Sequence, residues 1–153
     1  MDNELKIILD KAPTEQDLEF LSEGLDKDTF NKVGIEKLEE NIALFIKDGT
    51  GNMYGGLSMI LYLGCIYIHD VFVAEIIRNR GFATRLIHKA EVIAKENNCG
   101  FLALHTHQWQ ARGLYEKLGF KLKYIESGYK LNSELYYMVK IINPDCGYDF
   151  KIS

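Results

Sequence analysis

The sequence predicts an α/β protein in which a mixed, α+β type of sheet carries helices on its faces. The chain has 153 residues, which is a typical length for a single domain. Hydrophobic residues make up 47% of it and charged residues 26%, as in globular proteins that fold around their own core. Short apolar runs predict strands, and apolar residues spaced by three and four predict helices. These patterns follow one another in the order strand, helix, three strands, helix, strand, helix, two strands.

The first half of the chain is expected to supply one helix and four strands. The apolar run Leu5–Leu9 predicts the first strand. Thr14 predicts a helix start, because its hydroxyl can cap free N–H groups and acidic residues follow it. Further strands are predicted at Ile42–Ile46, Met53–Tyr62 and Cys65–Val73, and the Asp-Gly turn between the first two of these is typical of a hairpin.

The second half is expected to supply two helices and three strands. Apolar residues recur at intervals of three and four from Ala83, and Gly100 is a typical residue to end such a helix. The remaining elements are predicted at Phe101–Leu104 (strand), Gln110–Leu118 (helix), Phe120–Ile125 (strand) and Leu135–Ile142 (strand). We expect one domain over residues 1–153, with a core at about 4–142 and a C-terminal tail at 143–153.

Composition disfavours several classes of protein. There are 18 basic and 22 acidic residues, giving a net charge of −4, whereas nucleic-acid-binding domains are usually basic. Cys65, Cys99 and Cys146 are odd in number and lack metal-binding spacing, so we expect neither a disulfide framework nor a metal site. No secretory leader or membrane-spanning run is recognisable. We therefore expect a cytoplasmic protein without nucleic-acid or membrane partners.

The most informative segment joins a strand to a helix through a glycine turn. The chain leaves the strand near Val73, turns, and enters the helix at Gly81. The first N–H groups of a helix have no internal partners, and together with the helix dipole they attract anions. The small residues Gly81 and Ala83 allow close approach, while Arg78 and Arg80 add positive charge. The segment is therefore either a diphosphate site or simply a tight connection, and it contains neither a Walker loop nor a dinucleotide fingerprint.

Two short motifs follow one another along the chain. Arg78–Ala83 reads R-N-R-G-F-A, and Tyr115–Phe120, which begins 34 residues after Gly81, reads Y-E-K-L-G-F. They resemble the loop Q/R-x-x-G-x-G/A and the pattern Y-x-x-L-G-F of the GNAT superfamily of acyl-CoA N-acyltransferases. Gln110 and Ala111 resemble a bacterial branch of the family. The resemblance covers about residues 4–142.

The resemblance implies how acetyl-CoA would bind. Strands 65–73 and 100–106 would splay apart in a V, and the pantetheine arm would lie in that V. Gln108 stands where many members have Asn, a departure from the family pattern. Carried over residue by residue, the expected cofactor contacts are the main chain of Val71, Phe72 and Val73, the loop residues Arg78, Asn79, Arg80, Gly81, Phe82, Ala83 and Thr84, and the later residues Gln108, Ala111, Leu114 and Tyr115.

The resemblance also nominates residues for the chemistry of acyl transfer. Tyr115 would protonate the departing thiolate, and the N–H of Val71 would stabilise the oxyanion. A base must keep the amine neutral, and the candidates are His69, Asp70 and Glu75. A histidine side chain ordinarily changes its charge near neutral pH, so His69 suits this role directly or through water. Strand alternation predicts that His69 shares a sheet face with Val71.

The acceptor side is less specific. Family acceptor contacts fall on Leu25–Lys37, on the Asp48–Asn52 turn and on Tyr124–Tyr137, which are rich in tyrosine and acidic residues. The negative net charge favours a cationic amine. His105 and His107 share one predicted strand face and either line the acceptor cleft or bind a stray metal.

The sequence therefore predicts an N-acetyltransferase. It would move an acetyl group from acetyl-CoA to a primary amine of a small molecule or peptide, by direct attack in a ternary complex, as a monomer or homodimer. The main alternative is a non-catalytic acyl-CoA-binding sensor. A third possibility is a nucleotide-binding or interaction domain that shares the anion-binding loop by chance.

Overall fold

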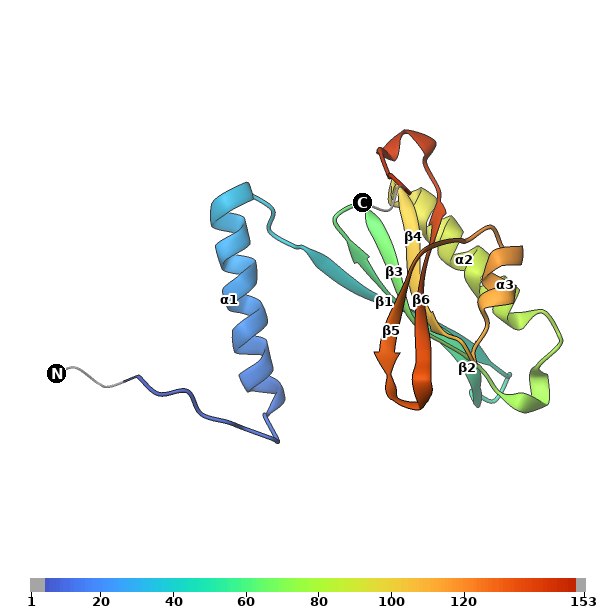
Figure 1. Ribbon diagram of the computed structural model, residues 1–153, viewed down its shortest axis with the longest axis horizontal. Helices are drawn as coiled ribbons and strands as arrows, with labels where there is room; N and C mark the ends of the chain where they lie inside the picture. Colours follow the sequence, from blue (N-terminus) through green and yellow to red (C-terminus); the bar gives the residue numbers. More distant parts are fainter. Residues whose placement is uncertain (1–4, 151–153) are drawn as a thin grey trace. The chain divides into compact units, whose positions relative to one another are not determined.

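The computed structural model describes residues 5–150, and the chain divides into two compact units at the Leu38–Glu39 boundary. The first unit contains one helix and the second contains the sheet (Figure 1). The elements are α1 (Glu15–Val33), β1 (Glu39–Lys47), β2 (Met53–Tyr62), β3 (Cys65–Val73), α2 (Phe82–Glu96), β4 (Phe101–His107), α3 (Arg112–Lys117), β5 (Lys121–Tyr129) and β6 (Ser133–Ile141), with short 3-10 turns at Glu75–Ile77, Lys130–Asn132 and Pro144–Cys146.

Helix α1 begins where the sequence predicted. The N–H of Asp17 donates to the Thr14 hydroxyl at 3.2 Å, and the N–H of Thr14 donates to the Asp17 carboxylate at 2.9 Å, forming a capping box. The helix ends at Gly34, whose φ of 73° suits glycine. The strand expected at Leu5–Leu9 is wrong, because residues 5–10 adopt no regular structure and their side chains are exposed. An apolar run is strand-like only when another strand pairs with it.

The second unit is built on a six-stranded sheet of order β1-β2-β3-β4-β6-β5. All neighbouring strands are antiparallel except β3 and β4, which are parallel. The Asp48 carboxylate accepts hydrogen bonds from Thr50 and Asn52 in the turn between β1 and β2, which explains the predicted hairpin. The mixed sheet confirms the predicted fold class.

Helices α2 and α3 pack against one face of this sheet (Figure 1). Leu86, Ile87 and Ala90 of α2 are buried in a core that also holds Leu102 of β4 and Met138 of β6. These helical positions have the predicted spacing, and burying each leucine or isoleucine side chain contributes about 2 kcal/mol before entropy costs. This packing fixes the start of α2 relative to the ends of the central strands.

The parallel strands separate halfway along their length. They pair only from Cys65 opposite Phe101 to Ile68 opposite Leu104. Beyond this point β3 contains a bulge, because Ile68 pairs with Met59 of β2 but Asp70 pairs with the adjacent Ser58. The bulge coincides with the separation of β3 from β4, so the strands form the predicted V.

The bulge also corrects the predicted side of His69. Ile68 faces the core, and so does Val71, three residues further on. Uninterrupted alternation would place these two residues on opposite faces. The extra residue resets the alternation, so His69 is exposed and does not share a face with Val71.

Residues 144–150 run past the opposite end of the sheet. The ring of Tyr148 lies 4.7 Å from that of Phe101, and Phe150 lies 5.0 Å from Tyr148, measured between ring centroids. Cys65 and Cys99 are buried, whereas Cys146 is exposed. Burial raises the pKa of Cys65 to about 11. Within residues 5–150, no helix combines the length and apolar character needed to cross a bilayer.

Candidate active site

A cavity of about 630 Å³ lies where β3 and β4 separate, and we call it the splay cavity. Its walls come from the end of β3, the turn before α2, the start of α2, and the segment from the end of β4 into α3. A cavity of this size suits a small molecule or part of a cofactor. Its lining residues are Val71, Phe72, Val73, Ile77, Arg78, Asn79, Gly81, Phe82, Ala83, Thr84, Trp109, Gln110, Ala111, Leu114 and Tyr115.

One wall is the uncapped start of α2. Gly81 precedes the helix with a φ of 78°. Within the described residues, no side chain caps the N–H groups at this N-terminal end of the helix. Asn79 also has a positive φ, of 59°. The Arg78 side chain donates through Nε to the carbonyl of Val73 at 3.0 Å, which holds the turn against the end of β3. The free N–H groups of the first helical turn therefore line the cavity, as an anion site requires.

Tyr115 forms part of the opposite wall and is only 7% exposed. Its ring lies edge-on to Phe120 at 5.7 Å, and its carbonyl accepts the Phe120 N–H at 3.0 Å. The last part of the Y-x-x-L-G-F motif thus fixes the tyrosine in place. Burial raises the pKa of Tyr115 above its ordinary value, so its hydroxyl stays protonated at neutral pH and can act as a proton donor.

The segment after β4 is held by two glutamines. Gln110 accepts the N–H of His107 at 2.7 Å, which fixes the turn carrying Trp109 into the cavity wall. Gln108 accepts the N–H of Glu134 at 3.1 Å and donates its own N–H to the Glu134 carbonyl at 3.2 Å. Gln108 therefore ties β4 to β6 and is not part of the cavity lining.

The candidate bases lie outside the splay cavity lining. Asp70 accepts a hydrogen bond from the Ser58 hydroxyl at 2.8 Å across the β2–β3 pair. His69 is exposed at the bulge and interacts electrostatically with His105 of β4. Burial, and then the charge of His69, lower the pKa of His105. Glu75 is exposed in the turn after β3.

The predicted cofactor residues lie together with two exceptions. All of them line the splay cavity except Arg80 and Gln108. The guanidinium of Arg80 lies over the ring of Phe82 at 5.5 Å instead. Three further residues, Ile77, Trp109 and Gln110, line the cavity but were not among the predicted cofactor residues. Gln110 had a sequence signal in the family resemblance, whereas an isoleucine or a tryptophan in a loop is usually explained by packing.

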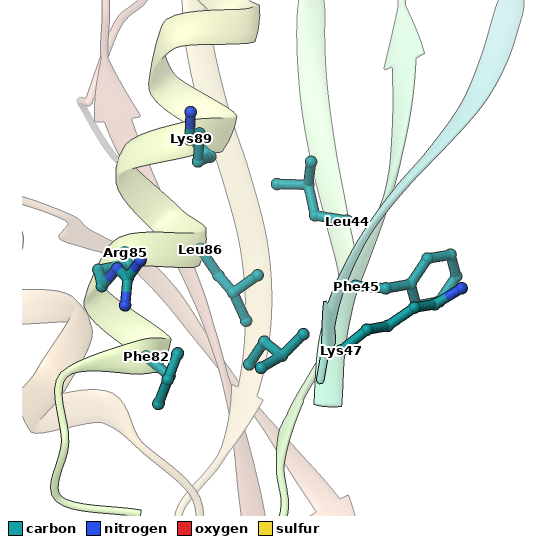
Figure 2. A pocket seen from close by; sticks show the side chains of 8 residues that line it. Leu44, Phe45, Lys47, Phe82, Arg85, Leu86 and Lys89 are labelled. Carbon is teal, nitrogen blue, oxygen red and sulfur yellow. The ribbon is translucent and has the colours of Figure 1, made fainter. Parts of the chain in front are cut away.

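A second hollow of about 430 Å³ lies between β1 and the first half of α2 (Figure 2). Leu44 and Leu86 point toward one another across it, while Phe45 and Lys47 point away on the outer side of β1. It holds no residue proposed for catalysis. Within residues 5–150, no three His, Cys, Asp or Glu side chains are grouped as metal ligands would be.

Comparison with known proteins agrees with this geometry. Residues 9–120 match the Acetyltransferase (GNAT) family. The chain is 28% identical over 85 residues to acetyltransferase Atu2258 of Agrobacterium fabrum, covering 56% of this chain and 62% of that protein. It is 39% identical over 67 residues to GCN5-related N-acetyltransferase 4, chloroplastic, of Arabidopsis thaliana, covering 42% of this chain and 23% of that protein. The chain thus spans less than two thirds of these curated relatives.

Solved structures show the same fold. An acetyltransferase from Bacillus cereus superposes with a TM-score of 0.71 at 22% identity, covering 88% of this chain and 97% of that one. An aminoglycoside 6'-N-acetyltransferase complexed with coenzyme A superposes with a TM-score of 0.62 at 16% identity, covering 87% and 97%. With the family match over most of the sheet and its motifs, this chain belongs to the GNAT acetyltransferase family.

Proposed function

We propose that this protein is an acetyl-CoA-dependent N-acetyltransferase that acetylates a primary amine of a small molecule or peptide. The carrying observation is the splay cavity, which joins a free strand edge, an uncapped helix start and a buried tyrosine. A relative in fold, the aminoglycoside 6'-N-acetyltransferase, is complexed with coenzyme A. The residues of the cavity fit such a cofactor, because it offers separate surfaces for an amide-bearing arm and for a diphosphate.

The two ends of coenzyme A would bind to different parts of the cavity. The pairing of β3 with β4 stops at Ile68, so Val71–Val73 can offer main-chain groups on that side to the pantetheine amides. The first turn of α2, from Gly81 to Thr84, would hold the diphosphate through its N–H groups. The thioester would then lie within reach of Tyr115.

Transfer would proceed by direct attack. The neutral amine nitrogen attacks the thioester carbonyl carbon, the carbon–sulfur bond breaks, and the N–H of Val71 would stabilise the oxyanion. The amine would lose one proton to His69 through water, because His69 lies outside the splay cavity lining, and Tyr115 would donate one to the departing thiolate of coenzyme A. Asp70 is the weaker candidate for the base, because Ser58 already occupies its carboxylate.

The test is thiol release from acetyl-CoA with a panel of amines. We expect amine-dependent release in the wild-type protein and a loss of about a hundredfold in kcat for Tyr115→Phe, because general acid catalysis contributes this much. Calorimetry should show unchanged coenzyme A affinity, since Phe keeps the packing against Phe120. Comparing the single variants His69→Ala and Asp70→Asn in the same assay identifies which residue is the base.

Two results would contradict the proposal. Full turnover by Tyr115→Phe would remove the assigned role of the tyrosine. Tight coenzyme A binding without turnover on any amine would favour the non-catalytic acyl-CoA sensor instead.

A further inference from the structure

A row of contacting aromatic rings leads away from the splay cavity. Trp109 lines that cavity, and its ring stacks on His107 with centroids 4.5 Å apart and planes 4° from parallel. The His107 ring in turn meets Tyr129 nearly at right angles, at 5.7 Å. His107 ends β4 and Tyr129 ends β5, so the row of rings joins the ends of these two strands.

Tyr129 also lines a separate cavity of about 330 Å³, which we call the tyrosine cavity. Two other lining residues contact the ring of Tyr137, which lies 4.7 Å from His105 in a tilted arrangement and 4.9 Å from Tyr124 in a stacked one. The Tyr124 hydroxyl and His105 Nε2 are 3.3 Å apart. The residues lining this cavity are His105, Tyr124, Glu126, Ser127, Gly128, Tyr129 and Leu135.

The lining of the tyrosine cavity suits a cation. Tyr124 and Tyr129 are 39% and 41% exposed, so their rings are available to a ligand. The face of an aromatic ring attracts a positive charge, and the Glu126 carboxylate adds a full negative charge. Because its pKa is lowered, His105 is neutral at pH 7 and does not repel a cation. The cavity volume is at the lower end of the range for small-molecule sites.

We propose that the tyrosine cavity binds a second positive group of the acceptor, so that the substrate class is small diamines and other amines bearing a second cation. This inference rests on the proposed function. One amine is acetylated in the splay cavity, while the second cation is held by the ring of Tyr129 and the carboxylate of Glu126. Trp109 lines the splay cavity, Tyr129 lines the tyrosine cavity, and the ring of His107 contacts both of these rings.

The experiment compares two acceptors of equal length with acetyl-CoA saturating. In n-pentylamine a methyl group replaces the second ammonium group of putrescine. We expect kcat/KM for putrescine to be at least about tenfold higher, as one cation–carboxylate or cation–π contact allows. Glu126→Gln should remove most of this preference and leave n-pentylamine unchanged. The matched control is Glu96→Gln, which removes an exposed carboxylate outside these cavities and should change neither substrate.

A second pair of variants separates the ring from the hydroxyl. Tyr129→Phe keeps an aromatic face and should keep the preference for putrescine, whereas Tyr129→Leu should lose it. Equal kcat/KM for both amines, or equal effects of Glu126→Gln on both, would overturn the proposal. If no amine turns over, the proposed function fails. Calorimetry of putrescine binding to the protein–coenzyme A complex then tests separately whether the tyrosine cavity binds a cation. Binding weakened by Glu126→Gln would support it, and no binding would overturn it.

Discussion

At the scale of single residues, Gly81 has two separable roles. Its φ of 78° strains any other residue, and it lines the splay cavity. A β-carbon at this position would meet no atom within 4 Å, so the protein itself has room for Ala. We expect Gly81→Ala to lower the free energy of unfolding by about 1 kcal/mol through backbone strain. We also expect coenzyme A affinity to fall about tenfold, because the added methyl group reduces the room for the diphosphate.

Gly64 provides the matched control. It has a φ of 81°, an equally open surrounding and no place in the splay cavity lining. Gly64→Ala should show the same loss in urea unfolding with an unchanged dissociation constant for coenzyme A by calorimetry. Equal affinity losses in both variants would mean that strain, rather than the cavity, explains the effect.

The site residues differ in how well the sequence predicts them. Six of the seven residues from Arg78 to Thr84 lie together in the splay cavity lining, at the helix start that the glycine turn predicts, whereas Arg80 does not. The sequence offered His69 as a candidate base but predicted the wrong sheet face for it. The bulge that changes its face follows from the β2–β3 register and leaves no local signal in the sequence. Gln108 was predicted as a cofactor residue, but its side chain binds Glu134, 26 residues away, which no local pattern shows.

At the scale of elements, a partly buried ion pair joins α2 to β6. Lys140 Nζ lies 2.6 Å from Glu91 Oε1, and the two side chains are 23% and 15% exposed. Removing one partner leaves the other charge poorly solvated. We expect Glu91→Ala to lower the free energy of unfolding by about 2 kcal/mol, and Lys140→Met combined with Glu91→Leu to restore most of it.

A second ion pair shows what burial adds. Arg112 and Glu116 lie 2.7 Å apart on α3, but their side chains are 37% and 49% exposed. Glu116→Ala should cost no more than about 0.5 kcal/mol in the same urea titration. Similar losses for Glu91→Ala and Glu116→Ala would show that burial does not control the strength of these pairs.

Periodicity predicted those helices and strands that pack against or pair with another element. The apolar stripe of α2 packs against the sheet, and alternate residues of β2 are buried, so both elements were predictable. Leu5–Leu9 has the composition of a strand but no pairing strand within the described chain. Strand formation is decided by such long-range pairing, which composition alone does not contain.

At the scale of the whole molecule, the sheet order explains why the site lies where it does. Three of the five strand pairings, β1–β2, β2–β3 and β5–β6, join strands that are consecutive in sequence through short turns, whereas β3 and β4 are joined through α2 and run parallel. The crossover leaves the start of α2 at the end of the sheet where these two strands separate. From α1 onward the strand and helix order was predicted from the sequence, whereas the strand predicted at Leu5–Leu9 is wrong and the point at which β3 and β4 separate was not predictable.

The contrast in cysteine burial has a practical consequence for experiments on this protein. A disulfide-exchange dye at pH 8 should titrate one thiol per native chain, Cys146, and three after unfolding, because Cys65 and Cys99 are shielded and hard to ionise. Absorbance readings with and without urea check this count, and three fast-reacting native thiols would contradict the burial. The same reagent that reports coenzyme A release thus carries a fixed background of one equivalent, and any rise in that background gives warning that a variant has lost its core.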